Sequence, residues 1–357
     1  MFLTYPFTFF VCGFLLGILA VHYIFTKEVE RAIGTLKNKK APGPDGVCNE
    51  HIKEIFPVME ETWTALFNKC LDMGDVPTEW RKSAIKMLYK GAGDPSNPDS
   101  YRGVALETTA LKVLAKLLVW RICPTLEVQL PDEQLGFRKD RSTIMAAEGL
   151  IKTIQNETKE KHGKLYVVFI DFSKAFDSAN RKKIIDKLQR MIEEPWTVRL
   201  ISNILAKNCV QIMDNVGKSA WIDQQNGVLQ GDPLSPILFN VLTHDAVNEV
   251  KNGSSGVDIY IYADDMALAS TEIEELQKAF NSLVNWADKN ELQINQKKTE
   301  LVVFRKGGRP AKKDEIYYRG QPLKKQNTYK YLGITIQMTG SSFSIHIRER
   351  LIRAVRS

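Results

Sequence analysis

The sequence lacks the clusters of cysteine and histidine that hold zinc or build a disulfide framework. Its 357 residues include five cysteines and five histidines, all scattered singly, with no CxxC pair and no Cys/His group. Zinc sites and disulfide scaffolds both need such residues at short, repeated spacings. The sequence therefore disfavours a zinc-binding domain and a disulfide-stapled secreted domain, and it suits a reducing compartment.

The sequence also lacks an internal repeat of the kind that builds solenoids. With 44% hydrophobic and 25% charged residues, it has the composition of a folded globular protein rather than a disordered one. A chain of this length can bury a large core and is expected to form more than one lobe. The net charge of +7 at pH 7 favours a polyanionic partner.

Charged side chains are missing from the first 26 positions. Within this leader, the apolar run Phe7–Phe25 is long enough to cross a bilayer as a helix. It lacks a basic n-region, which disfavours a cleaved signal peptide. The basic residues that begin at Lys27 would leave the main body in the cytoplasm. Two interpretations stay open: a transmembrane helix that makes the membrane a partner through residues 1–26, and a leader that is not native to the domain.

Two adjacent carboxylates stand between two short apolar runs. The stretch Asp258–Ser270 reads DIYIYADDMALAS, with a strand-like run on each side of Asp264 and Asp265. Two such runs around a short polar turn predict a β-hairpin. Like charges held this close are unfavourable unless a cation neutralises them, and Mg²⁺ is the usual ion where oxygen ligands converge. An ordinary Asp-rich turn is the alternative.

A third carboxylate follows another apolar run. Leu165–Ile170 is continuously apolar, as in a buried strand, and Asp171 stands at its end. A charge at the edge of a buried sheet is costly without a partner. If Asp171 lies beside Asp264 and Asp265, two Mg²⁺ ions among the three carboxylates would remove that cost, and such a pair is the standard device for in-line phosphoryl transfer.

Several loops carry polar or basic residues suited to nucleotides. One is NGVLQGDPLSP, whose glycines allow close backbone approach and whose Gln230 is well placed to contact a bound nucleotide. A predicted strand–turn–strand segment carries Lys86, Lys90 and Arg102, which together suit a triphosphate. The basic loop at Arg138 suits a nucleic-acid backbone, with a solvated loop as the alternative.

Taken in order, these stretches resemble one known family, the reverse transcriptases of non-LTR (LINE-like) retrotransposons. The resemblance is carried by FIDFSKAFD, GVLQGDPLSP, YADD and YLGITI, preceded by KAPGPDG, YRGVALETTALKVLAKLL and QLGFRKDRST. It covers residues 27–347, nearly the whole chain after the leader. It implies an α+β, right-hand polymerase fold with an antiparallel palm sheet, largely helical fingers and a truncated thumb.

The resemblance also implies a division of the chain. We expect an apolar leader at 1–26, a fingers region at 27–160, a palm with finger insertions at 161–337, and the start of a truncated thumb at 338–357. No endonuclease domain is expected before the polymerase, because only the apolar leader lies there. The family implies a nuclear workplace, whereas the leader indicates a membrane.

By the same resemblance, four residues are catalytic. Asp171, Asp264 and Asp265 are implied to bind two Mg²⁺ ions, and Lys298 is implied to lie near the pyrophosphate leaving group. The implied reaction is the addition of deoxynucleotides to a primer by two-metal phosphoryl transfer. The implied partners are an RNA template, a DNA primer and deoxynucleoside triphosphates.

Three further residues are implied to contact the incoming nucleotide. Phe176 matches the bulky gate that disfavours a ribose 2′-OH, Gln230 matches the glutamine beside the nucleotide, and Arg102 is similar to the arginine that contacts the triphosphate. Tyr331–Ile336 resembles the primer grip.

Two alternatives to an active RNA-directed DNA polymerase remain open. The first is a truncated, catalytically inactive relic that at most binds RNA, which the expected shortening of the thumb favours. The second is a protein like the group II intron maturases, which shares the palm motifs. The intact aspartates, gate and loop glutamine favour the polymerase.

Overall fold

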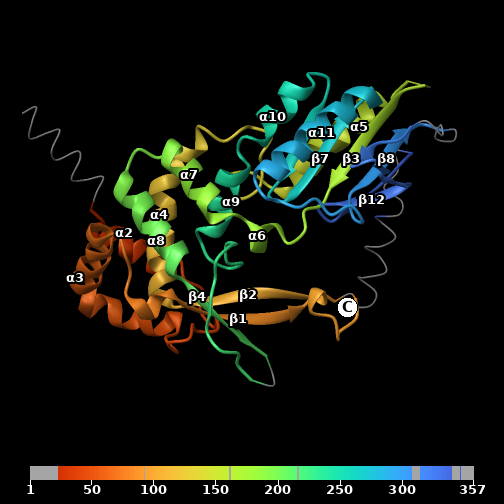
Figure 1. Cartoon of the computed structure of the whole chain (residues 1–357). Coiled ribbons are helices and arrows are strands. Elements are labelled where there is room, and N and C mark those ends of the chain that lie inside the picture. The colour runs from red at the N-terminus through yellow and green to blue at the C-terminus, as the bar shows by residue number, and fades with distance from the viewer. Residues whose placement is uncertain are drawn as a thin grey trace, which may run out of the picture. The chain divides into compact units, whose positions relative to one another are not determined.

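The protein is described here from a computed structural model, which covers residues 23–91, 93–160, 162–214, 217–307, 314–339 and 346. The chain divides into two compact units, each described by itself. Unit 1 consists of Met1–Leu126 and Ile185–Ser235, and unit 2 consists of Glu127–Ile184 and Pro236–Ser357. Each unit combines helices with a β-sheet (Figure 1), as the predicted α+β class requires. The finer boundaries of fingers, palm and thumb stay predictions.

Unit 1 contains a largely buried helix, α4 (Thr109–Glu127). Its buried residues recur along its length from Thr109 to Leu126, and a helix that is apolar on most sides belongs in a core. The other helices of the unit are α2 (Thr26–Gly34), α3 (Asn49–Met73), α8 (Pro195–Lys207), the short 3₁₀ turns η1 (Thr78–Arg81) and η2 (Pro98–Ser100), and part of α7 (Arg181–Met191), which begins in unit 2.

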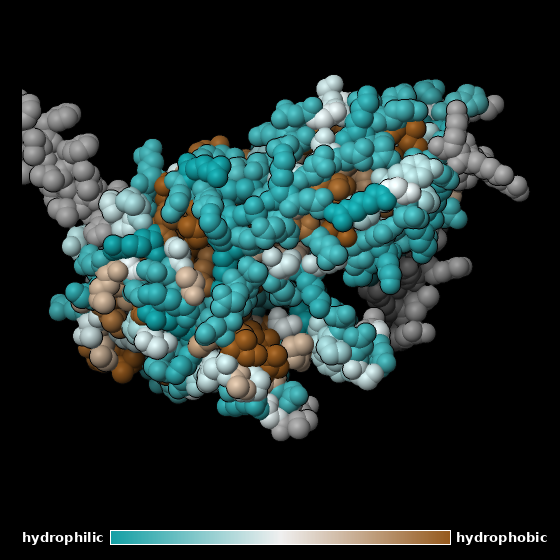
Figure 2. Space-filling view, in the orientation of Figure 1, coloured by the Kyte–Doolittle hydropathy of each residue, from teal (hydrophilic) through white to brown (hydrophobic). Residues whose placement is uncertain are grey.

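The sheet of unit 1 has the order β2-β1-β4-β5. Its strands are β1 (Lys82–Tyr89), β2 (Tyr101–Glu107), β4 (Cys209–Met213) and β5 (Ile222–Asp223). Strands β1 and β2 form the antiparallel hairpin that the sequence predicts, and β4 joins β1 in parallel. Hydrophobic surface gathers beside β1 and β4 in Figure 2, and the exposed apolar residues of this sheet include Leu88, Ile212 and Ile222.

Unit 2 is organised around a five-stranded sheet of order β11-β8-β3-β7-β6. Central β3 has six buried residues in succession, Leu165–Ile170, and its neighbours β7 and β8 both run antiparallel to it. Strand β11 alone pairs in parallel, with β8. The predicted buried strand and hairpin are thus confirmed. The strands are β3 (Lys164–Ile170), β6 (Asp258–Tyr262), β7 (Asp265–Ser270), β8 (Glu300–Arg305) and β11 (Lys324–Gln326).

Different elements cover the two faces of this sheet. Strand residues such as Val167 and Phe169 share a core with α5 (Thr143–Glu157) and with the hairpin of β12 (Thr328–Tyr331) and β13 (Ile334–Gln337). Helix α11 (Ile273–Lys289) lies against β3 and β7 outside that core, so it covers the other face (Figure 1). The remaining elements are α6 (Ala175–Ser178), α9 (Ser235–Thr243), α10 (Ala246–Gly253), β9 (Tyr317–Tyr318) and β10 (Gln321–Pro322).

The prediction of a transmembrane helix at Phe7–Phe25 is corrected. Among the described helices, none is both long enough and apolar enough to cross a bilayer; residues 1–22 of the leader lie outside the described part. The end of the predicted span belongs to the folded unit instead. Ile24 is 2% exposed. Its N–H donates to Oδ1 of Asn68 on α3, and its C=O accepts from Nδ2 of the same side chain. The expected thumb segment, 338–357, also lies almost wholly outside the described residues.

Candidate functional site

The three predicted aspartates come together where β3 ends and β7 begins. The last paired residues of the two strands are Ile170 and Met266. In an antiparallel ladder the next two residues, Asp171 and Asp265, therefore face each other. Asp264 precedes β7 in the tight turn of the β6–β7 hairpin. The fold of unit 2 thus gathers carboxylates that are distant in sequence.

These carboxylates disfavour one another's charge. Although the side chain of Asp265 still reaches solvent, the protein around its carboxylate raises its pKa to about 6, and the negative charges of Asp264 and Asp171 contribute. Burial also raises the pKa of Asp171, opposed by the charge and hydrogen bond of Lys298 and by a hydrogen bond from Asn295. Such a group of oxygen ligands gains strongly from a divalent cation.

The chemistry of this donor set fits Mg²⁺, although the side chains are not drawn together around one point. Within the described ranges, no group of three His, Cys, Asp or Glu residues has the spacing of a metal site. Asp171 pairs instead with Lys298, whose Nζ lies 3.8 Å from Asp171 Oδ2. Three carboxylates that repel one another at an accessible strand end remain the kind of hard oxygen set that Mg²⁺ takes.

The backbone around Asp171 places Lys298 beside it. The N–H of Asp171 donates to Thr299 Oγ1 at 3.3 Å, and its C=O accepts from the N–H of Asn295 at 2.8 Å. The N–H of Lys298 in turn donates to the C=O of Asn295 at 3.1 Å. The turn that precedes β8 is therefore tied to the end of β3, and the predicted catalytic lysine lies next to a predicted catalytic aspartate.

Phe176, the predicted gate, lies on α6 a few residues after Asp171. Its ring stacks on Phe239 of α9, with centroids 4.5 Å apart and an interplanar angle of 13°. A second ring, Phe137, meets it edge-on at 6.2 Å. Phe176 is only partly buried, so one part of the ring is anchored and another part can face a ligand.

The other predicted nucleotide residues, Gln230 and Arg102, lie in unit 1. The C=O of Gln230 accepts from the N–H of Ala105 at 2.8 Å, so its loop runs along β2. Gly231 has φ of +113° and passes so close to Ala105 that a Cβ would be 3.1 Å from its carbonyl oxygen, which explains the glycine. Arg102 is exposed on the same strand. Arg102 thus lies on β2 and Gln230 lies beside the same strand. The aspartates, Lys298 and Phe176 lie in unit 2.

A buried pair of carboxyl groups beneath the Gln230 loop was missed by sequence reasoning. Glu107 is 1% exposed at the end of β2, and Asp232 is 7% exposed. Burial, with repulsion from Asp232, raises the pKa of Glu107 well above its usual value; burial also raises the pKa of Asp232 to about 6. Lys112 on α4 offsets part of both shifts. No local pattern could reveal the pair, because its members are far apart in sequence.

The basic loop near Arg138 is less open than the sequence suggests. The side chain of Arg138 is 4% exposed and pairs with Glu127 at 2.8 Å. It also donates to the C=O of Pro131 at 2.6 Å and of Gln134 at 3.1 Å. Arg138 therefore holds its own loop together, and Lys139 is the neighbouring basic residue that is exposed.

The segment that resembles a primer grip is the β12–β13 hairpin. Its turn lies at Leu332 and Gly333, which both have positive φ. Tyr331 is 2% exposed in the core of unit 2, and Tyr329 stacks on Phe169 of β3 at 3.9 Å. The hairpin is thus anchored to the central strand by aromatic rings, and Leu332 of its turn packs against the same core.

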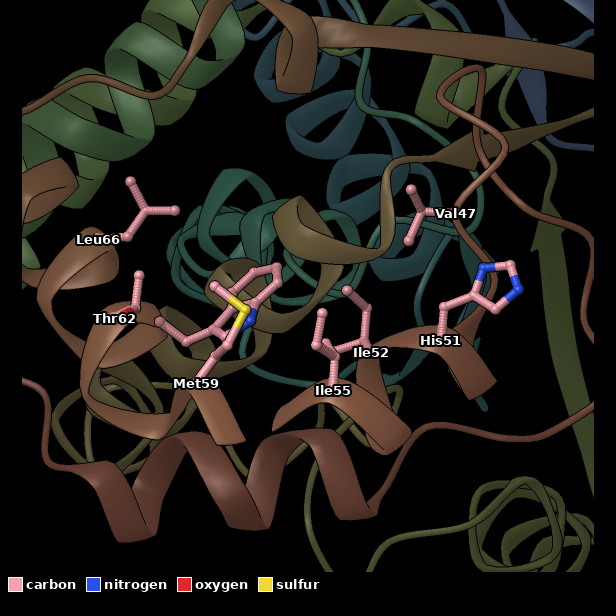
Figure 3. A pocket seen from close by; sticks show the side chains of 8 residues that line it. Val47, His51, Ile52, Ile55, Met59, Thr62 and Leu66 are labelled. Atoms are coloured by element: carbon pink, nitrogen blue, oxygen red, sulfur yellow. The ribbon is translucent and has the colours of Figure 1, made fainter. Parts of the chain in front are cut away.

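An apolar cavity of about 390 Å³ lies along α3 in unit 1 (Figure 3), a volume typical of small-molecule sites. It is lined by α3 side chains such as Ile55, Met59 and Leu66, with Val47 from the preceding loop. None of the predicted catalytic or nucleotide-contacting residues lines it. The cavity therefore belongs to the helical part of unit 1 and contributes no chemistry to the sites above.

A family model for reverse transcriptase (RNA-dependent DNA polymerase) matches residues 90–336. The chain therefore belongs to the reverse transcriptase family. It is 30% identical to the RNA-directed DNA polymerase from mobile element jockey of Drosophila melanogaster, over 90% of this chain and 36% of that protein. It is 25% identical to the Pol polyprotein of retrotransposable element R2 of Popillia japonica, over 89% of this chain and 46% of that protein.

These similarities identify a reverse transcriptase domain of the non-LTR, LINE-like kind. They favour this interpretation over a protein like the group II intron maturases. The chain spans 36% of the length of the jockey protein, so it corresponds to a part of such proteins. Among solved structures, it resembles apo telomerase from Candida tropicalis with a TM-score of 0.51 and 15% identity, over 79% of this chain and 60% of that one. That likeness supports the fold.

Proposed function

We propose that this chain extends a DNA primer on an RNA template by adding deoxynucleotides. The observation that carries the proposal is the placement of Asp171, Asp264 and Asp265 at the neighbouring ends of β3 and β7, where burial and repulsion from the other two raise the pKa of Asp265 to about 6. Reverse transcriptases generally use divalent metal ions. Two Mg²⁺ ions bound by these carboxylates would supply charge neutralisation and orientation for in-line phosphoryl transfer.

The remaining residues take separate tasks in this reaction. The primer 3′-hydroxyl loses its proton to solvent and its oxygen forms the new bond to the α-phosphorus, while the bond from that phosphorus to the bridging oxygen breaks and pyrophosphate leaves with that oxygen. Lys298, beside Asp171, donates a proton or a hydrogen bond to that leaving group. Phe176, anchored on Phe239, packs under the deoxyribose and excludes a 2′-OH. In unit 1, Gln230 and Arg102 carry side chains suited to a nucleotide and to its phosphates.

A primer-extension assay with the full chain tests this function. We expect extension of a DNA primer on an RNA template with Mg²⁺, and none when EDTA removes the ion. Asp264→Asn should lower the rate by more than about 100-fold, because it weakens the electrostatic centre of the reaction. Wild-type chain that binds the primer–template but never extends it would support the inactive relic instead.

A further inference from the structure

A short strap in unit 2, Glu133–Phe137, lies along β6 and ends beside the turn that carries the aspartates. The N–H of Leu135 donates to the C=O of Ile261 at 2.9 Å, and the N–H of Ile261 donates to the C=O of Glu133 at 3.2 Å. The strap therefore adds a short parallel pairing to β6, at the edge of the unit 2 sheet. Backbone pairing of this kind fixes the position of the strap relative to the hairpin.

The side chain of Gln134 reaches from this strap into the turn. It is 1% exposed. Its Oε1 accepts the N–H of Gly136 at 2.9 Å and the N–H of Ala263 at 3.2 Å, and its Nε2 donates to Thr243 Oγ1 at 3.4 Å. A buried backbone N–H that loses its only acceptor is strongly unfavourable. The side chain of Gln134 thus provides the hydrogen-bond acceptor for the backbone N–H of Ala263, the residue directly before Asp264.

Ala263 adopts a conformation that needs such support. Its φ is +58°, a left-handed conformation that is unfavourable for any residue with a Cβ. Strained conformations of this kind persist where the surroundings determine them, and they are frequent at functional sites. Ala263 directly precedes Asp264, so its conformation contributes to the path of the chain at the two aspartates.

Gly136 completes the contact from the strap. A Cβ on Gly136 would collide with the backbone nitrogen of Ala263, so only glycine lets the strap lie flush against the turn. The C=O of Gly136 accepts from Nδ2 of buried Asn240 at 2.8 Å, which ties the strap to α9. The turn is therefore held from one side by a strap that is itself fixed at both ends.

We propose that Gln134 is a positioning residue of the polymerase site, which holds the Ala263 turn so that Asp264 and Asp265 point at the metal ions. This inference rests on the proposed function for its catalytic consequence. The polar atoms that orient metal ligands commonly control affinity as much as the ligands do. A purely structural role would stabilise the fold of unit 2 and leave metal binding unchanged.

Two substitutions of Gln134 separate these roles. Gln134→Met keeps the length of the side chain and removes the acceptor, whereas Gln134→Glu keeps an oxygen for Ala263 and loses the donor to Thr243. Hydrogen exchange of the Ala263 amide and binding of Mn²⁺ are measured on the full chain without primer or nucleotide. Gln155→Met, on an exposed site of α5, is the matched control.

The Met variant should exchange the Ala263 amide at least tenfold faster and bind Mn²⁺ roughly tenfold more weakly, the usual effect of losing a partner that orients metal ligands. In primer extension, kcat should fall while the KM for the nucleotide stays within about twofold, because the nucleotide contacts are untouched. The Glu variant should retain most of the amide protection, and the control should match wild type.

Unchanged exchange and unchanged Mn²⁺ affinity in folded Gln134→Met would overturn the inference. If that variant does not fold, the wild-type chain decides: the Ala263 amide should be protected as strongly as that of Ile261, and exchange at the rate of an open turn would refute the role of Gln134. Absence of primer extension by the wild-type chain would count against the proposed function alone, because exchange and Mn²⁺ binding are measured without substrate.

Discussion

Both units contain carboxyl groups whose pKa is raised, and the groups differ in what can reach them. In unit 2, Asp265 is raised to about 6 while its side chain reaches solvent at a strand end. In unit 1, Asp232 is raised to about 6 while it is 7% exposed beside Glu107. A cation from solvent can neutralise the repulsion at Asp265, whereas it has no access to the buried pair of Asp232 and Glu107. A perturbed pKa therefore indicates a ligand site only where the group is accessible.

The largest expected effect comes from Asp265→Asn in the accessible group. Activity in primer extension should fall by more than about 100-fold, because a charge that holds the ions is lost. The free energy of unfolding at pH 7 should rise slightly at the same time, because like-charge repulsion with Asp264 and Asp171 is removed. Asp258→Asn, at the exposed start of β6, is the matched control and should change neither quantity.

An Asp265→Asn variant with lower activity and also a lower free energy of unfolding would contradict this prediction. It would mean that the Asp265 carboxylate supports the fold of the hairpin instead of straining it. Urea unfolding and single-turnover extension on the same preparations give the two quantities.

An intermediate effect is expected from the gate. Replacing Phe176 by Leu, Val and Ala should raise ribonucleotide incorporation relative to deoxyribonucleotide in that order, by roughly tenfold or more for Ala, which corresponds to about 1.4 kcal/mol. The reason is that a smaller side chain on Phe239 leaves room for the 2′-OH. Competition between the two nucleotides in primer extension measures the ratio. A loss of activity that is equal for both would assign Phe176 to the core.

The smallest effect on activity is expected from the inaccessible pair, Glu107 and Asp232. The folded pKa values of Glu107 and Asp232 lie above their unfolded values, so the folded state holds more protons and stability falls as pH rises through that interval. For Asp232 the interval runs from 3.8 to about 6. The side chain introduced by Glu107→Gln cannot ionise and no longer repels Asp232, so the variant should lose less stability than wild type as the pH rises to 7.

Unfolding by urea between pH 4 and pH 8 measures that slope, with exposed Glu61→Gln on α3 as the control. Extension at pH 7 should stay close to wild type in both variants. A pH slope that Glu107→Gln leaves intact would place the titrating groups elsewhere.

The sequence predicts the strands that carry the three aspartates because their patterns are local. Leu165–Ile170 is apolar throughout and becomes the buried β3, and the runs around Asp264 and Asp265 become β6 and β7. The family resemblance then brings Asp171 into the same site. In each case the signal lies within a dozen residues.

The remainder depends on contacts between distant segments, which no local pattern reveals. Gln134 reads as a loop residue until β6 lies beside it, and Glu107 reads as a strand end until Asp232 is packed above it. The prediction of a transmembrane helix in the leader was wrong for a related reason. An apolar segment suits a protein interior as well as a bilayer, and Ile24 is buried against α3. The roles of the three aspartates, Phe176, Gln230, Arg102 and Lys298 stay predictions.

The central claim is that Asp171, Asp264 and Asp265 hold the divalent ions of the reaction. Anomalous diffraction from crystals of the full chain with primer–template, a non-reactive deoxynucleotide and Mn²⁺ tests it most directly. The account predicts anomalous peaks within coordination distance of all three carboxylates, with the Lys298–Asp171 pair opened to admit them. Peaks elsewhere, or a Lys298–Asp171 pair that persists with no ion at Asp265, would contradict it.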